Sequence, residues 1–200
     1  MSRKAVTDHP VHELIARRWS PYGFADRPVS VEDLRSLFEA VRWAASSYNE
    51  QPWRYIVASK ENGQEFERLL SCLVEANQGW AREVPVLALG CVNLNFSRNG
   101  KPNAAAIHDL GLASANLTFE ATERGLVVHQ MIGILPDRAR EVYIVPEGSQ
   151  AVTALAIGYA ADPDNLPEAF KERDLAPRTR NPLAAFVFAG KWGDSSDLAG

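Results

Sequence analysis

The chain has 200 residues, a formal net charge of −4, 46% apolar residues and 23% charged residues. A chain of this size and composition buries one sizeable core, so we expect one domain over residues 1–200. The arginines are scattered rather than gathered in a stripe, so we do not expect a nucleic-acid binder. The sequence has no apolar N-terminal leader and no run of about 18 apolar residues that would predict a membrane span. We therefore expect a cytoplasmic protein.

The first half of the chain predicts three helices and two strands. The periodicity of apolar residues places helices at 11–19, at 31–44 after an N-cap at Ser30, and at 61–74. Strands are expected at 54–58 and 84–92. The second strand is almost entirely apolar, which is typical of a strand covered on both faces.

The second half predicts the longest helix and the rest of the sheet. The expected elements are a helix over 104–124 that stops at Gly125, a strand over 126–131, a short helix over 137–143, and a strand over 152–159. Residues 163–182 read as a polar connector, 186–188 as a last strand, and 193–200 as a flexible tail. The elements together predict an α+β domain in which helices pack against a sheet.

Several common chemistries are missing from the sequence. No GxGxxG, GxxxxGK[ST], GxSxG or HExxH pattern occurs. Cys72 and Cys91 belong to no CxxC pair and are expected to be buried thiols. His9 and His12 are interpreted as surface residues. His108 and Asp109 are open to two interpretations, a base with its orienting carboxylate or an ordinary helix start at which the dipole favours an acid.

Four separated segments resemble the nitroreductase family. They carry a basic motif, a Ser-Ser-x-Asn-x-Gln-Pro-Trp loop, a strand that ends in a turn glycine, and a late basic pair, at residues 17–24, 44–53, 125–133 and 178–183 respectively. Their order and spacing agree with the family from about residue 11 to residue 192. The second motif is the most specific of the four.

The resemblance implies a fold, a cofactor and an assembly. The fold would be nitroreductase-like, with a central mixed β-sheet flanked by helices, in an intertwined homodimer. The cofactor would be FMN, with NADH or NADPH as the electron donor and a nitroaromatic, quinone or related electrophile as the acceptor. No catalytic side chain is assigned, because the flavin carries the chemistry. Two alternatives stay open: a narrower flavoenzyme (enone reductase, dehalogenase or dehydrogenase) and a non-catalytic FMN-binding protein.

The resemblance also names the residues that would bind the cofactor. Guanidinium groups grip phosphate through paired, charge-assisted hydrogen bonds, and the phosphate contacts would come from Arg17, Arg18, Ser20, Arg178 and Arg180. Taken singly, each arginine is also compatible with an ordinary solvated surface. Which of Arg17 and Arg18 contacts the phosphate is left open, because Trp19 is an extra residue in the first motif.

The remaining contacts would surround the flavin ring. Ser46, Ser47 and Asn49 would reach the flavin of the other subunit, although such residues are also ordinary turn formers. Asn77 would bond to the ring, or else simply cap a helix near Gly79. The segment Gln130, Met131, Ile132, Gly133 would lie along the isoalloxazine, with the glycine permitting close approach, or would be a plain strand end.

Some positions depart from the family pattern. Tyr22 stands where many members carry a basic residue, Trp80 where several members carry a lysine, and Ile132 where an acid is frequent. Ala45 replaces a frequent proline. Loss of the basic residue at position 80 predicts weaker stabilisation of an anionic reduced flavin and therefore a different redox potential.

Overall fold

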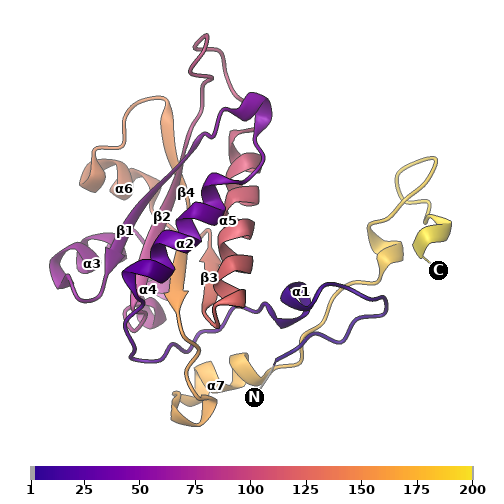
Figure 1. Ribbon diagram of the computed structural model, residues 1–200, viewed down its shortest axis with the longest axis horizontal. Helices are drawn as coiled ribbons and strands as arrows, with labels where there is room; N and C mark the ends of the chain where they lie inside the picture. The colour runs from indigo at the N-terminus through magenta and orange to yellow at the C-terminus, as the bar shows by residue number, and fades with distance from the viewer. Residues whose placement is uncertain (1–2, 200) are drawn as a thin grey trace.

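The computed structural model describes residues 3–199, and its centre is a four-stranded sheet (Figure 1). The strands are β1 Trp53–Ser59, β2 Val86–Asn93, β3 Val127–Met131 and β4 Ser149–Gly158, in the order β1-β2-β4-β3. All three pairings are antiparallel, so the expectation of a mixed sheet is wrong for this part of the chain. The reason is visible at β1 and β2, where the connection returns to the end of the sheet that it left and Lys60 N–H bonds to the Pro85 carbonyl over 2.8 Å.

Helices cover both faces of the sheet (Figure 1). On one face lie α2 Val31–Arg42 and α5 Ala106–Glu123; on the other lie α3 Gly63–Leu70, α4 Glu75–Ala81 and α6 Pro136–Tyr143. Each face has its own apolar core, and seven of the eight residues of β2 are buried. The apolar run in the sequence is therefore explained by burial on both faces, as predicted.

The predicted helix ends are confirmed where the local chemistry is strong. The Ser30 hydroxyl accepts a hydrogen bond from Asp33 N–H over 3.0 Å and starts α2. After α5, Gly125 adopts a φ of +75°, a conformation that favours glycine. Both signals act within a few residues, so tertiary packing does not alter them.

Three predictions about elements are wrong. The polar connector contains a helix, α7 Glu168–Leu175, and α4 was not expected at all, because these helices of eight and seven residues bury few side chains of their own. Residues 186–188 form no strand, since the chain there has left the sheet. In that region the structure has a 3₁₀ turn at Leu183–Ala185 and an isolated bridge between Phe188 and Ser195.

The last part of the chain extends away from the body beside the N-terminal segment (Figure 1). This C-terminal arm, residues 176–199, leaves large apolar side chains uncovered, with Phe186, Trp192 and Leu198 at 60%, 92% and 80% exposure. The arm ends in a short turn at Asp197–Ala199, and Gly200 lies outside the described residues. The flexibility of 193–200 stays a prediction.

Candidate functional site

Arg178 joins the two ends of the chain. Its Nη1 donates to the carbonyls of Arg3 and Ala16 (2.9 Å for the latter), and its Nη2 donates to the Arg18 carbonyl over 2.7 Å. The Ala16 carbonyl lies within α1 Glu13–Arg17 and the Arg18 carbonyl directly after it; this helix is shorter than the predicted 11–19. Most of the guanidinium donors of Arg178 therefore bind backbone carbonyls, and Arg178 holds in place the backbone that carries Arg18.

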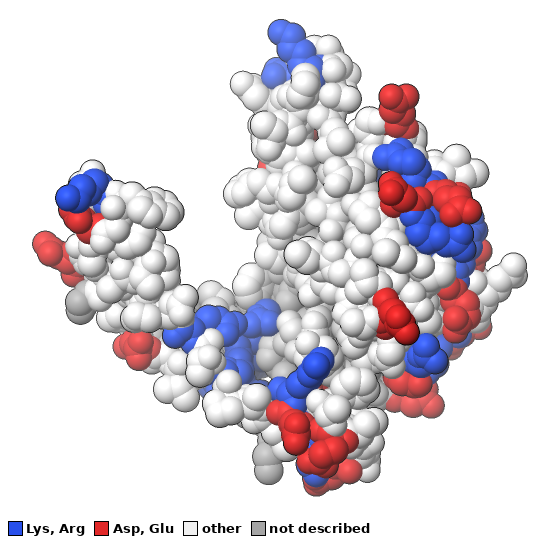
Figure 2. All heavy atoms as spheres, turned by 180° about the vertical axis from the view of Figure 1, so that it is seen from behind, with Lys and Arg blue, Asp and Glu red and all other residues white. Residues whose placement is uncertain are grey.

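Arg18 and Arg180 form an uncompensated positive site. Burial, and then the nearby charge of Arg180, lower the pKa of Arg18. The Arg18 Nη1 lies 3.2 Å from the Ser20 hydroxyl. Within residues 3–199 no carboxylate pairs with Arg18, Arg178 or Arg180, and basic side chains gather where the arm leaves the body (Figure 2). A cluster of guanidinium groups without an acid suits a multiply charged anion.

Arg17 turns the other way. Its Nη2 donates to the Thr122 carbonyl at the end of α5 over 2.8 Å and lies 3.9 Å from the Glu123 carboxylate. The structure thus brings together Arg18, Ser20, Arg178 and Arg180, and it engages Arg17 with a helix end, where a cation complements the dipole.

The turn after β3 is held by Asn77. The Asn77 side-chain amide donates to the Gly133 carbonyl over 2.9 Å, and a Cβ at Gly133 would lie 2.4 Å from the same nitrogen. Close approach of Asn77 is therefore what requires this glycine. Asn77 lies inside α4, so its interpretation as a helix cap is wrong. Ile132, at 84% exposure, projects from the turn.

The strand residues before the turn are anchored to their neighbours. The Gln130 amide donates to the Thr118 hydroxyl over 2.9 Å and to the Ser114 carbonyl over 3.2 Å, both on α5. The carbonyl of buried Met131 accepts from the Thr153 hydroxyl on β4 over 3.0 Å. The end of β3 is consequently a rigid edge rather than a loose strand end.

Tyr22 and Trp80, which replace basic residues found in members of the family that the sequence resembles, pack together in one aromatic cluster. Their ring centroids lie 5.4 Å apart, and His129 packs against both, at 4.8 Å from Tyr22 and 4.6 Å from Trp80. The His129 Nδ1 lies 2.7 Å from the Pro21 carbonyl, and burial lowers the pKa of the imidazole. An aromatic cluster therefore occupies the positions at which the resemblance implies basic residues, and the Arg173 guanidinium carbon lies 4.9 Å from the Tyr22 ring centroid.

Asp174 is a positioning residue that sequence reasoning missed. This carboxylate on α7 is 3% exposed and accepts hydrogen bonds from Tyr22 N–H over 2.8 Å and from Gly23 N–H over 2.9 Å. It fixes the chain directly after Ser20. The sequence offered little signal, because α7 lay in a stretch that looked like a polar connector.

The loop over residues 46–51 has an unusual backbone. Tyr48, Asn49 and Gln51 adopt φ values of +54°, +55° and +50°, a conformation that costs L-residues other than glycine roughly 1–2 kcal/mol each. The Ser46 hydroxyl accepts from Gln51 N–H over 3.0 Å, and the Gln51 amide donates to the Asn49 side-chain oxygen over 3.1 Å. Strain held by such bonds is typical of functional loops.

Asp109 supports this loop from α5. Its buried carboxylate accepts from Ser47 N–H over 3.1 Å. His108 is exposed, and no hydrogen bond joins it to Asp109 in the described part of the chain. The structure thus favours the helix-start interpretation of this pair over a catalytic one.

Two groups of predicted site residues lie at opposite ends of α5. Ser47 contacts Asp109 in the first turn, whereas Arg17 contacts Thr122 in the last full turn. These two helix positions are thirteen residues apart, a rise of about 20 Å. The loop 46–51 and the arginine cluster of the same chain therefore lie too far apart to grip one phosphate.

The remaining predictions concern the thiols and the membrane. Cys72 and Cys91 are free and buried, as predicted, and burial raises the pKa of Cys91 to about 11. Among the helices of residues 3–199, none combines the length and apolarity needed to cross a membrane.

Comparison with known proteins places the fold. A solved structure described as an oxidoreductase containing FMN shares 32% identity, with a TM-score of 0.89 over 98% of this chain and 99% of the other. The major NAD(P)H-flavin oxidoreductase of Aliivibrio fischeri is 41% identical over 191 residues, covering 76% of this chain and 88% of that protein. The nitrobenzene nitroreductase of Ectopseudomonas oleovorans is 36% identical over 75 residues, 38% of this chain and 32% of its own.

The sequence pattern of the Nitroreductase family matches residues 15–159. This range contains three of the four motifs, the whole sheet and helices α2 to α6. The chain belongs to the Nitroreductase family.

Proposed function

We propose that the protein is an FMN-dependent oxidoreductase that takes hydride from NADH or NADPH and passes the electrons to a nitroaromatic, a quinone or a related electrophile. The names of its relatives in Aliivibrio fischeri and Ectopseudomonas oleovorans support this proposal. When bound, the flavin supplies the hydride chemistry, and the protein binds, orients and tunes it.

The observation that carries the proposal is the acid-free arginine cluster. Arg18 and Arg180 are close enough for one to lower the pKa of the other, and no carboxylate among residues 3–199 neutralises them. The FMN phosphate carries nearly two negative charges and three acceptor oxygens, which this donor set fits. Arg178 would act from beneath, through its grip on the Arg18 carbonyl.

The ring would lie against the end of β3. Gln130 and Met131 are fixed to α5 and β4, and Asn77 is fixed to Gly133, so this edge is preorganised before a ligand arrives. Ile132 would offer the ring an apolar surface, and the Tyr22–Trp80 cluster would lie beside it, with the Arg173 guanidinium carbon 4.9 Å from the Tyr22 ring centroid.

The test is spectroscopic. Purified apoprotein is titrated with FMN and, in parallel, with riboflavin, which lacks the phosphate. We expect FMN to bind and riboflavin to bind at least about a hundredfold more weakly. The FMN-loaded protein should then bleach under anaerobic conditions with NADH or NADPH. A protein that never acquires a flavin spectrum would contradict the proposal.

The same assay separates the alternatives. Flavin binding without bleaching by either nicotinamide would favour a non-catalytic FMN-binding protein. Bleaching followed by reoxidation with one enone, halogenated compound or similar substrate, and with no nitroaromatic or quinone, would favour a narrower enzyme of the same fold.

We further propose that two copies of the chain complete each site. The loop 46–51 and the arginine cluster sit at opposite ends of α5, so the loop would close the pocket of the other copy. Support comes from uncovered apolar side chains on α5 and on the C-terminal arm: Ile107, Leu112, Phe186 and Trp192. Surfaces of this kind are normally buried in an interface.

Subunit mixing tests the shared site. One variant carries Arg18→Ala and Arg180→Ala, and the other carries Asn49→Gly, which keeps the left-handed backbone but removes the amide side chain. In a mixed dimer one pocket receives both defects and the other receives none. After unfolding and refolding an equal mixture, about half of the dimers are mixed, and we expect tight FMN binding at about a quarter of all sites, which is half of the sites in the mixed dimers. Recovery of no tight site, or a monomer that binds FMN tightly, would contradict the shared site.

A further inference from the structure

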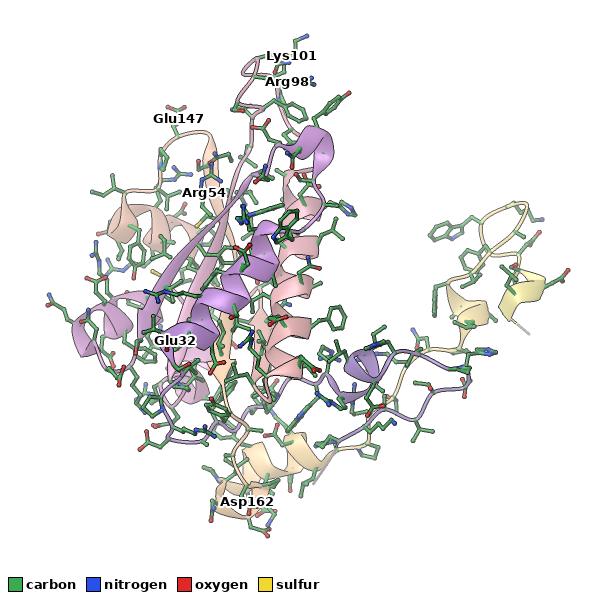
Figure 3. All side chains as sticks on the ribbon, in the orientation of Figure 1. Glu32, Arg54, Arg98, Lys101, Glu147 and Asp162 are labelled. Atoms are coloured by element: carbon green, nitrogen blue, oxygen red, sulfur yellow. The ribbon has the colours of Figure 1, made fainter. Side chains whose placement is uncertain are left out.

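A short hairpin beside the loop 46–51 carries two basic side chains that form no ion pair with an acid among residues 3–199. The hairpin, residues 94–103, is closed by the bridge between Asn95 and Pro102 and by the bond from Phe96 N–H to the Lys101 carbonyl over 2.8 Å. Arg98 and Lys101 stand at its tip (Figure 3). On the face drawn in Figure 2 the tip shows basic atoms and no acidic ones.

Arg98 is held in place by aromatic rings. Its guanidinium carbon lies 4.0 Å from the Tyr48 ring centroid and 5.2 Å from that of Phe96, and the two rings meet edge to face at 5.7 Å. Stacking of this kind fixes the plane of a guanidinium while leaving its N–H groups free to bind. No carboxylate in the described chain pairs with either Arg98 or Lys101.

The hairpin is also tied to the loop directly. Ser97 N–H donates to a Glu50 carboxylate oxygen over 2.7 Å, and this backbone bond, followed at longer range by Arg98 and Arg54, lowers the pKa of Glu50. Tyr48, which supports Arg98, lies between Ser47 and Asn49. The Arg98 guanidinium is therefore attached, through Tyr48 and Glu50, to the loop that is proposed to close the flavin pocket.

We infer that Arg98 and Lys101 bind the pyrophosphate of the nicotinamide dinucleotide that reduces the flavin. This inference rests on the proposed function and on the shared site. The donor must lay its uncharged nicotinamide against the flavin ring, which leaves the anionic pyrophosphate at the mouth of the pocket. The chain has no GxGxxG motif to receive that group.

Five other arginines near the site are already engaged or assigned to the cofactor. Arg178 and Arg17 are bonded to backbone carbonyls, and Arg18 with Arg180 would hold the FMN phosphate. Arg54 donates to the carbonyls of Gln51 and Trp53. The hairpin tip is left as the positive group with unused donors beside the loop.

The test compares an anionic and an uncharged hydride donor. The variant Arg98→Ala/Lys101→Ala is prepared with FMN bound and reduced anaerobically by NADH, by NADPH and by 1-benzyl-1,4-dihydronicotinamide, which has no phosphate. We expect the concentration for half-maximal reduction to rise about tenfold for both dinucleotides and to stay unchanged for the uncharged donor. The control is Arg35→Ala, an exposed arginine on α2, which should behave like the wild type with all three donors.

A binding measurement needs no turnover. Calorimetry with a tetrahydronicotinamide dinucleotide, which cannot transfer hydride, should show the same tenfold loss of affinity in the double variant, and the FMN dissociation constant should not change. An unchanged affinity, or an equal loss for the uncharged donor, would overturn the inference. A wild-type protein that no nicotinamide reduces would instead contradict the proposed function.

Discussion

The segments that pack at the two ends of α5 differ in their backbone conformation and in their charge. At its C-terminal end the neighbouring backbone is well paired, and Arg178 and Asp174 spend their polar atoms on holding Arg18 and its segment in place. At its N-terminal end the loop 46–51 holds three non-glycine residues in the left-handed region. One end is a relaxed platform with excess positive charge, and the other is a strained loop.

This difference predicts how much each of the two regions contributes to cofactor binding. The arginine cluster, here called the platform, can hold a permanent cofactor tightly, because the fold already orders its side chains before the cofactor binds. If the strained loop meets the cofactor of another copy, as proposed, it contributes to binding only after the two copies assemble. We therefore expect changes at the platform to affect cofactor affinity most, and changes at the loop to affect it less.

The largest loss of FMN affinity should come from removing the two positive charges of Arg18 and Arg180. Arg18→Ala with Arg180→Ala is expected to weaken FMN binding at least about a hundredfold, because two charge-assisted contacts are lost. Fluorescence titration of the apoprotein measures it, and riboflavin affinity should stay the same. If Arg35→Ala weakened binding equally, general electrostatic attraction rather than a built cradle would be responsible.

The second effect concerns the support beneath the platform. Asp174→Ala leaves the N–H groups of Tyr22 and Gly23 unpaired in a buried place, so the free energy of unfolding should fall by about 2–3 kcal/mol. Chemical denaturation measures this loss. Asp164→Ala on the neighbouring turn breaks an exposed pair with Lys171 and should change stability by less than about 1 kcal/mol. Equal losses would show that Asp174 holds nothing special.

At the strained loop the expected change is smaller. Asn49→Gly should weaken FMN binding about tenfold, the scale of one good hydrogen bond, without lowering the melting temperature. Asn49→Ala should weaken it similarly but also lower the melting temperature, because alanine tolerates the left-handed backbone poorly. A glycine variant with wild-type affinity would break the comparison, since the loop would then contribute nothing to the pocket.

The smallest effect is a pH dependence carried by His129. Burial keeps its pKa below the ordinary 6.5, so the unfolded chain takes up this proton before the folded chain does. Stability should therefore fall as the pH drops from 6.5 towards the lowered value. The Asp174 carboxylate opposes the shift, while Tyr22 and Trp80 pack around the ring. His129→Gln should flatten this part of the profile, and denaturation midpoints at pH 7 and pH 5.5 measure it.

Local signals made much of the fold predictable. Ser30, Gly125 and the apolar run of β2 act through neighbouring backbone or through burial on both faces, so sequence patterns found them. The helix α7 was not predicted, because its main buried residue is Asp174, and the hydrogen bonds that stabilise this carboxylate come from N–H groups about 150 residues away. No periodicity can reveal a contact of that kind.

The candidate site was predictable as a set of residues rather than as an arrangement. The four arginines were found by motif, yet their different uses depend on which carbonyls the folded chain presents to them. Likewise, Tyr22 and Trp80 stood out as two separate departures. The packing of Tyr22 against Trp80 makes them a single change in the chemistry of the pocket.

The grip of Arg178 on three carbonyls has a consequence for handling the protein. The acceptors belong to Arg3, Ala16 and Arg18, so the backbone of Arg3 helps to support the proposed anion site, and the Arg3 side chain lies close enough to contribute to the lowered pKa of Arg178. Proteolytic loss of Arg3 would remove one of the two acceptors of Arg178 Nη1 and would weaken the support of Arg18. Cofactor loss during storage is thus expected to track clipping of the N-terminus even while the sheet stays folded.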